Sequence, residues 1–153
     1  MGTVKKPASD AARTLTQLNE FLGSELAAVE TYKLALDNLE HPSKARTSLE
    51  SCLQSHQQRV SLLKSAVAQH GGVPAQGSGA WAKLVQVVEG LADDIGDKAT
   101  VAALELGEDH DLAAYQRDLA GLDDSARTLV EMQLLPKQQQ TQHQISELRK
   151  LLH

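Results

Sequence analysis

Cysteine, aromatic residues and long apolar runs are scarce in this chain of 153 residues, and each scarcity excludes a class of protein. The single cysteine, Cys52, cannot form an internal disulfide, so the chain is no disulfide-stabilised domain and fits a reducing compartment. One phenylalanine, one tryptophan and two tyrosines are too few for a surface that stacks nucleic-acid bases. No apolar run reaches the ~20 residues that a membrane-spanning helix needs.

Positive charge is also limited, with 15 Lys and Arg against 20 Asp and Glu and a formal net charge of -5. No basic stripe marks a phosphate-binding surface, so we expect no nucleic-acid partner. The first ten residues lack the apolar core of a secretory signal, and Lys6 stands where a myristoylation signal has Ser or Thr. We therefore expect a cytoplasmic protein with no membrane partner. Gly-rich phosphate loops and G-x-S-x-G motifs are missing, so nothing favours a hydrolase or transferase.

Leucine, alanine, glutamine and glutamate dominate the remainder, and apolar residues recur every three or four positions, as in amphipathic helices. Helix breakers interrupt this pattern at 41–43, 71–72 and 121–124. The length fits one domain, which we place at residues 9–153 after a flexible tail at 1–8. The sequence predicts four long helices, the last kinked at Pro136: about 9–40 (capped by Ser9 or Asp10), 44–70, 97–120 and 125–152.

The connections between the predicted helices differ in length. Short links join the first helix to the second and the third to the fourth, whereas a longer connection between the second and third contains a loop at 71–79 and a short helix at 80–92. Bundles with one crossover have this layout. We therefore expect an all-α, antiparallel ferritin-like four-helix bundle whose helix 2–3 crossover contains a short helix.

Each of the first three helices carries one ionisable residue within its apolar stripe: Glu25, His56 and Glu108. One such residue alone is usually a hydrogen-bonded core residue. Three at a similar depth need compensation, because an unpaired buried charge costs several kcal/mol. Three solutions stay open: a metal ion, a protonated His56 that bridges both carboxylates, or carboxyl groups that share a proton.

The two halves of the chain share a Glu-to-Tyr spacing. Glu25 precedes Tyr32 by seven residues, and Glu108 precedes Tyr115 by seven. A spacing of seven residues keeps two side chains on one helix face. Both glutamates are therefore expected on the same face as a tyrosine.

The fourth helix contains a histidine, His143, in the stretch QQQTQHQI. The apolar positions of the second and fourth helices align so that Thr141, and not His143, corresponds to His56; the aligned pairs are Val60 with Ile145, Leu63 with Leu148 and Val67 with Leu152. His143 lies roughly 180° from the centre of the apolar stripe. We expect it to face solvent unless Pro136 induces a π-bulge that rotates the following turn.

Three stretches carry a family resemblance. LNEFLGSELAAVETY (18–32) resembles the first helix of bacterioferritins, SHQQRVSLL (55–63) the second helix, and LGEDHDLAAY (106–115) the Glu-to-Tyr pattern of rubrerythrin-like proteins. The whole layout is similar to small uncharacterised bacterial domains of the ferritin-like superfamily. The resemblance implies metal ligands at Glu25, His56 and Glu108.

The chain departs from that family at the two bridging glutamates, each of which stands three residues before a histidine. Leu53 occupies the first place, and Gln140 or Gln138 the second, depending on the alignment. Such bridges normally hold two metals ~3.5–4 Å apart, so we do not expect di-iron oxidase or ferroxidase activity. What remains is a candidate site for one divalent metal (Fe, Mn or Zn), or for none: Glu25, His56 and Glu108, with Gln138 or Thr141 as weak oxygen donors.

Two functions are compatible with these residues. The first is a ferritin-like protein whose degenerate carboxylate–histidine site binds a single divalent metal, and the second is a non-catalytic bundle for interaction or stress response without metal. Outward leucines at Leu34 and Leu106 favour a homodimer through bundle faces. No catalytic residue is predicted. Cys52 is expected to pack in the second helix's stripe, His110 to face solvent and Asp111 to reach the core edge.

Overall fold

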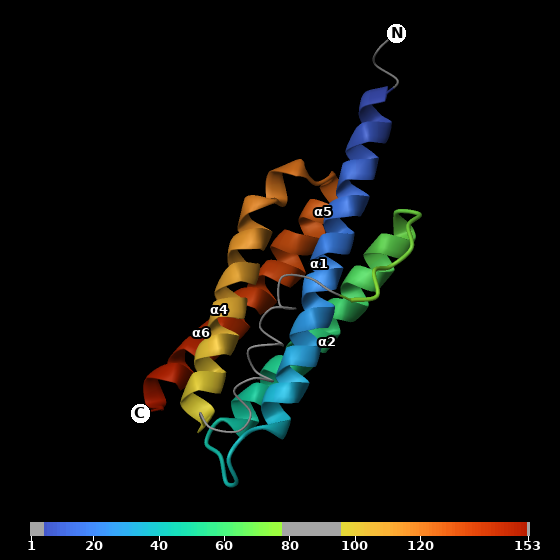
Figure 1. Cartoon of the computed structure of the whole chain (residues 1–153). Coiled ribbons are helices and arrows are strands. Elements are labelled where there is room, and N and C mark those ends of the chain that lie inside the picture. The colour runs from blue at the N-terminus through green and yellow to red at the C-terminus, as the bar shows by residue number, and fades with distance from the viewer. Residues whose placement is uncertain (1–4, 78–95, 153) are drawn as a thin grey trace.

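The part of the chain that this computed structural model describes, residues 5–77 and 96–152, is all-α (Figure 1). Side chains are described from residue 10 onward. The short helix expected at 80–92 lies outside the described residues. The helical elements are α1 (Lys5–Asp37), α2 (Arg46–Gln69), α4 (Gly96–Arg117), the 3-10 turn η2 (Leu119–Gly121), α5 (Asp124–Leu129), the π-helical turn η3 (Val130–Leu134) and α6 (Leu135–Leu151).

Helix α1 begins at Lys5, before the expected start at Ser9 or Asp10. Pro7 then lies in the first turn, where its missing N–H breaks no helical hydrogen bond. The division of the chain into a tail at 1–8 and a domain at 9–153 stays a prediction.

The predicted glycine pair ends α2. Gly71 adopts a φ of +78°, which is open to glycine at little cost. The Gly72 N–H then donates to the Val67 carbonyl at 3.0 Å. A Cβ on Gly72 would lie 2.3 Å from Leu15 Cδ1, so this link also packs tightly against α1.

Contacts at both ends fix how α1 and α2 lie together. Asn19, in the first half of α1, donates to the Val73 carbonyl and accepts from the Ala75 N–H, both just beyond the end of α2. Arg46, at the start of α2, donates to the Leu36 carbonyl near the end of α1. The beginning of each helix therefore lies beside the end of the other, and α4 and α6 form a second closely packed pair (Figure 1).

Among the described residues, two apolar clusters lie in the interior with a polar layer between them. Along α1, α2, α4 and the consecutive elements α5, η3 and α6, polar residues separate the members of one cluster from those of the other. The first cluster includes Ala28, Tyr32, Leu49, Cys52, Leu104 and Ile145. The second includes Leu18, Leu22, Leu63, Tyr115, Val130 and Leu134. The polar layer includes Glu25, His56, Arg59, Glu108, Gln138 and Thr141.

The C-terminal helical segment, residues 124–151, differs from the single kinked helix expected at 125–152. A π-helical turn, η3, precedes Pro136 and joins α5 to α6. The buried residues Ala126, Val130, Leu134 and Gln138 are spaced by four, and each such step overshoots a full α-helical turn by roughly 40°. The wider π turn takes up this excess and keeps the four side chains on the inner face.

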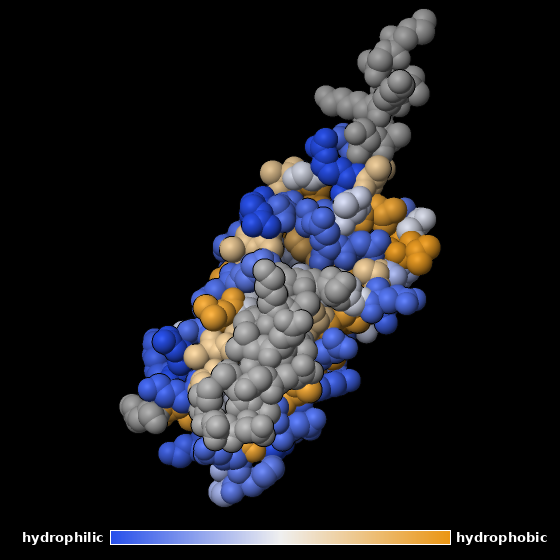
Figure 2. Space-filling model, viewed as in Figure 1, coloured by the Kyte–Doolittle hydropathy of each residue, from blue (hydrophilic) through white to orange (hydrophobic). Residues whose placement is uncertain are grey.

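On the face that Figure 2 shows, the coloured surface is mostly hydrophilic, with scattered apolar side chains. Among the residues whose side chains are described, four large apolar ones are exposed: Val73, Leu106, Met132 and Leu151. Leu34, expected to point outward, is half-buried. Within 5–77 and 96–152, no helix has both the length and the apolar character that crossing a membrane requires.

Candidate functional site

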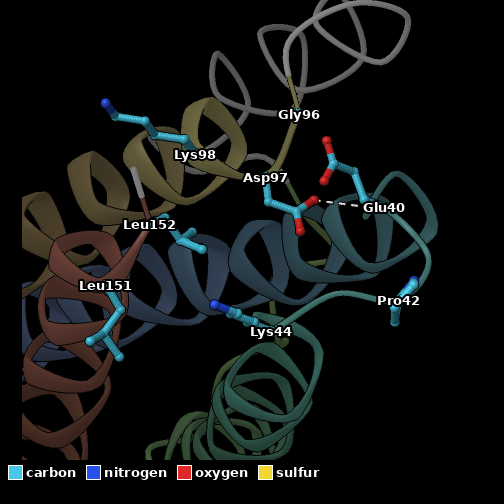
Figure 3. A pocket seen from close by; sticks show the side chains of 8 residues that line it. All are labelled: Glu40, Pro42, Lys44, Gly96, Asp97, Lys98, Leu151 and Leu152. Atoms are coloured by element: carbon cyan, nitrogen blue, oxygen red, sulfur yellow. Dashed lines mark hydrogen bonds between the residues drawn. The ribbon is translucent and has the colours of Figure 1, made fainter.

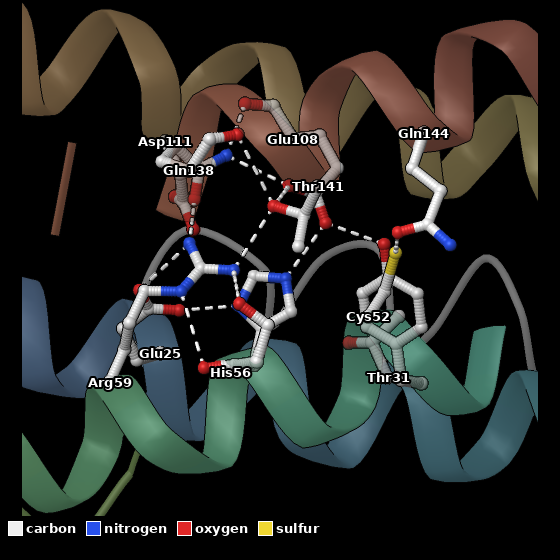
Figure 4. Close-up of polar contacts among 12 residues, drawn as sticks. Glu25, Thr31, Cys52, His56, Arg59, Glu108, Asp111, Gln138, Thr141 and Gln144 are labelled. Carbon is white, nitrogen blue, oxygen red and sulfur yellow. Dashed lines mark hydrogen bonds and ion pairs between the residues drawn. The ribbon is translucent and has the colours of Figure 1, made fainter. Parts of the chain in front are cut away.

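The three residues singled out from the sequence meet at the centre of the bundle (Figure 4). His56 Nδ1 lies 2.5 Å from Glu25 Oε1, and His56 Nε2 lies 2.7 Å from Glu108 Oε2. All three side chains are at most 1% exposed. Helical spacing therefore predicted their convergence correctly, whereas their role as metal ligands stays a prediction.

His56 stands between the two glutamates and not beside them. The two ring nitrogens of an imidazole point in divergent directions, and each faces one carboxylate here. A metal ion bound to one ring nitrogen would lie near one glutamate. The other glutamate would lie on the opposite side of the imidazole ring. Of the three solutions left open by the sequence, this geometry matches the bridging imidazolium.

Arg59 is the member of the centre that sequence reasoning missed. Its side chain is fully buried, and its Nη1 lies 3.2 Å from Glu25 Oε2. Arg59 follows His56 by three residues and precedes Leu63 by four, which is the spacing of the inner face of a helix. That spacing could have identified it, but the alignment placed the half-buried Val60 there.

Two tyrosines bond the glutamates crosswise between the halves of the chain. The Tyr32 hydroxyl, on α1, donates to Glu108 Oε2 on α4 at 2.5 Å. The Tyr115 hydroxyl, on α4, donates to Glu25 Oε2 on α1 at 2.7 Å. The equal Glu-to-Tyr spacing thus places each tyrosine against the other half's glutamate.

Helix α6 completes the shell around Glu108. Gln138 Nε2 donates to Glu108 Oε1 and to the Glu108 backbone carbonyl, both at 2.8 Å. Thr141 Oγ1 donates to Glu108 Oε1 at 2.7 Å. His143 is exposed, as expected, even though a π turn precedes it. The internal correspondence therefore identified the inward positions of α6 correctly.

The charges of the centre support one another. Burial alone would raise the pKa of the Glu25 carboxyl, but Arg59 and then His56 outweigh it and lower that pKa below 4.5. Burial also opposes ionisation of Glu108, and His56 lowers its pKa nonetheless. Burial would lower the pKa of His56, but Glu108 counters it most strongly and the pKa rises to about 9. At neutral pH Glu25 and Glu108 are therefore anionic, and His56 and Arg59 are cationic.

The neighbouring hydroxyl and thiol groups are held in their neutral forms. Burial, and then Glu108, raises the pKa of Tyr32 well above 10.0, and burial with Glu25 does the same for Tyr115. Burial raises the pKa of Cys52 to about 12, with Glu108 the next cause. Cys52 is fully buried in the α2 stripe, as predicted, and a thiol in this state is a poor nucleophile.

The donor atoms do not fit a mononuclear metal site as they stand. Both nitrogens of His56 are occupied by carboxylates, and the positive guanidinium of Arg59 lies against Glu25. Across residues 5–77 and 96–152, no group of three or more His, Cys, Asp and Glu side chains is arranged to hold a metal ion. Nearby, Asp111 is buried and contacts His110, which is half exposed.

Another histidine–carboxylate contact joins the end of α2 to the start of α5. His70 Nε2 lies 2.9 Å from Asp123 Oδ2 and 3.5 Å from Ser125 Oγ. The serine and the carboxylate share one ring nitrogen, whereas a nucleophilic triad uses both nitrogens. Asp123 also accepts from the Ala126 N–H as the N-cap of α5. This contact therefore has the geometry of a helix cap.

A pocket of about 490 Å³ lies at the end of the bundle, between the α1–α2 link, the start of α4 and the end of α6 (Figure 3). Asp97 accepts from the Glu40 N–H at 2.9 Å and from Ser43 Oγ at 2.5 Å. The carboxylate thereby ties the α1–α2 link to the start of α4. Lys44 and Lys98 also line the pocket, so charges of both signs surround it.

Comparison with known proteins identifies the family of the chain. Residues 13–120 match the profile of the family described as Domain of unknown function (DUF2383). The matched segment includes Glu25, His56, Arg59 and Glu108, and it ends before Gln138 and Thr141. The search of curated proteins and the search of solved structures returned no match.

Proposed function

The chain belongs to the DUF2383 family, and on that premise we propose that it is an antiparallel ferritin-like four-helix bundle that works as a cytoplasmic, non-catalytic interaction protein. In this proposal an ion-pair network stands where other bundles hold metal. The helix order, the contacts between the ends of α1 and α2, and the polar layer at mid-length support the ferritin-like assignment.

The observation that carries the proposal is the arrangement of cations around the two glutamates. His56 occupies one oxygen of each carboxylate, and Arg59 contacts the second oxygen of Glu25. Buried carboxylates need positive charge nearby, which a metal supplies in many bundles and two side chains supply here. Carboxylates that are already paired with cationic side chains have less affinity for a divalent cation.

The partner that we propose is a second copy of the chain, bound through a bundle face. Leu106 on α4 is 65% exposed, and Met132 on η3 is 72% exposed. Burial of exposed apolar side chains against a partner lowers the free energy and so favours association. In this proposal Leu106 lies within the dimer interface.

Metal analysis tests the core of this proposal. Purified protein should contain far less than one Fe, Mn or Zn per chain by plasma mass spectrometry, and a chelator should leave its melting temperature unchanged. A metal at ~100-fold excess over its dissociation constant would add about 2.7 kcal/mol of stability. Stoichiometric metal that disappears in Glu25→Ala would overturn the proposal in favour of the mononuclear site.

Sedimentation velocity tests the partner. The wild-type chain should sediment as a dimer, and Leu106→Glu should shift it toward monomer without changing its helix content. Glu105→Gln, on the adjacent and partly buried position, serves as the matched control. A wild-type protein that remains monomeric at every concentration contradicts the homodimer.

A further inference from the structure

Oxygen atoms surround the terminal nitrogens of Arg59. Nη2 donates to Thr141 Oγ1 at 3.0 Å and to Ser55 Oγ at 3.2 Å. Nη1 donates to Gln138 Oε1 and lies 3.2 Å from Glu25 Oε2. These four side chains come from α1, α2 and α6, and Figure 4 shows three of them, Glu25, Gln138 and Thr141, facing the guanidinium.

We infer that the guanidinium of Arg59 fills a latent site for a hard divalent cation, which the chain can bind once that side chain is shortened to a neutral one. The inference rests on the proposed metal-free centre and goes one step further, because it assigns the exclusion of metal to one residue. The latent site differs from the site predicted from the sequence, since it uses neither nitrogen of His56.

The ligand chemistry identifies the class of cation. A carboxylate, an amide oxygen and hydroxyl groups are hard oxygen donors, which suit Mn²⁺, Mg²⁺ and Ca²⁺. All four donor groups already face a positive charge, so their oxygens are oriented for a cation. Two of the four direct their own hydrogen atoms away from the guanidinium: Thr141 Oγ1 donates to Glu108, and Gln138 donates to Glu108 through Nε2.

Charge explains why Arg59 excludes the metal. With Arg59 in place, Glu25 already contacts two cationic side chains, and a divalent ion would add charge beside a buried guanidinium. Without Arg59, His56 is the cationic contact that Glu25 keeps, and Glu108 shares that same imidazole. The centre then carries net negative charge in a buried environment, which favours cation binding.

The test compares Arg59→Met with Arg59→Lys, using Mn²⁺ as the probe. Methionine keeps part of the aliphatic volume and removes the charge, whereas lysine keeps the charge. Electron paramagnetic resonance should show about one bound Mn²⁺ per chain for R59M and none for R59K or the wild type. At ~100-fold excess over the dissociation constant, Mn²⁺ should raise the melting temperature of R59M by about 5–10 °C.

A double variant separates binding from folding. Arg59→Met combined with Glu25→Gln removes both members of the ion pair, so it should fold without metal and bind no Mn²⁺. The inference is overturned if R59M leaves Mn²⁺ free in solution, or if R59M stays unfolded with and without Mn²⁺. Stoichiometric Mn²⁺ in the wild type contradicts the proposed function itself, so the two failures are distinguishable.

Discussion

Arg59 Nη1 lies 3.2 Å from Glu25 Oε2, and both side chains are buried at the centre of the bundle. A buried ion pair of this kind gains little over an apolar pair of similar volume, but it is costly to break. Removal of either partner leaves the other as a charge with too little compensation. The pair therefore makes the fold sensitive to single changes at either position.

Glu25→Gln should lower the free energy of unfolding by about 3–5 kcal/mol, because it leaves Arg59 buried without its carboxylate. Urea denaturation monitored by circular dichroism measures this loss. Arg149→Gln is the control, since it breaks the more exposed Glu105–Arg149 pair and should cost at most about 1 kcal/mol. Similar losses in the two variants would show that burial of the central pair has no special effect.

Stability should depend on pH through His56. Its pKa of about 9 in the folded state exceeds the ordinary 6.5, so its contribution is complete below pH 6.5 and is lost as the pH rises through 9. The loss is on the order of 3 kcal/mol. Urea midpoints measured across this range should fall for the wild type.

The same titration in two variants provides the control. His56→Gln should remove most of the decline, while His143→Gln should leave it unchanged because His143 lies on the surface. At acidic pH the sign reverses. The lowered carboxyl pKa values of Glu25 and Glu108 give stability above pH 4.5 that is lost as the pH falls below it. A wild-type midpoint that stays constant from pH 6.5 to 9 would contradict the bridging imidazolium.

The two tyrosines offer an optical test, because the chain contains no others. Both pKa values lie well above 10.0, so neither hydroxyl should ionise while the fold persists. Tyrosinate absorbance should therefore appear together with the loss of helical circular dichroism in an alkaline titration. Tyr115→Phe should halve the amplitude, and removal of its hydrogen bond to Glu25 should cost about 1.5–3 kcal/mol. Ionisation of either tyrosine in a fully helical protein would place that hydroxyl in solvent.

Deletion of Met132 should be tolerated. This exposed residue lies in η3. Without it, the buried residues from Val130 onward would be spaced alternately by three and four positions, as on one face of a regular α-helix. The melting temperature should fall by only a few degrees. Deletion of the exposed Gln139 in α6 should abolish cooperative melting, because it rotates everything after it by roughly 100°. Equal loss in both deletions would refute this role of the π turn.

Local sequence patterns were sufficient to predict the main helices and part of the centre. Apolar spacing interrupted by a polar residue identified Glu25, His56 and Glu108, and these positions depend only on the helix that carries them. The same spacing placed Thr141 inward and His143 outward. These features are properties of single helices and do not depend on which helices lie next to one another.

Some features that depend on the packing of several helices were missed or left undecided by the sequence. Arginine side chains usually reach solvent. The burial of Arg59 depends on its contacts with Glu25 from α1 and Gln138 from α6. The position of His56 between the carboxylates also follows from the packing of three helices. The π turn requires knowledge of which residues are buried, because the four-residue spacing is visible only among those positions.

The charged layer between the two apolar clusters has a consequence for helix alignment. Leucine and alanine side chains tolerate a slide of one turn along a neighbouring helix, since one hydrocarbon contact replaces another. A slide of α2 by one turn would move His56 and Arg59 into hydrocarbon and separate both from Glu25. The charged layer therefore specifies one axial register of the helices, as isolated polar residues do in coiled coils.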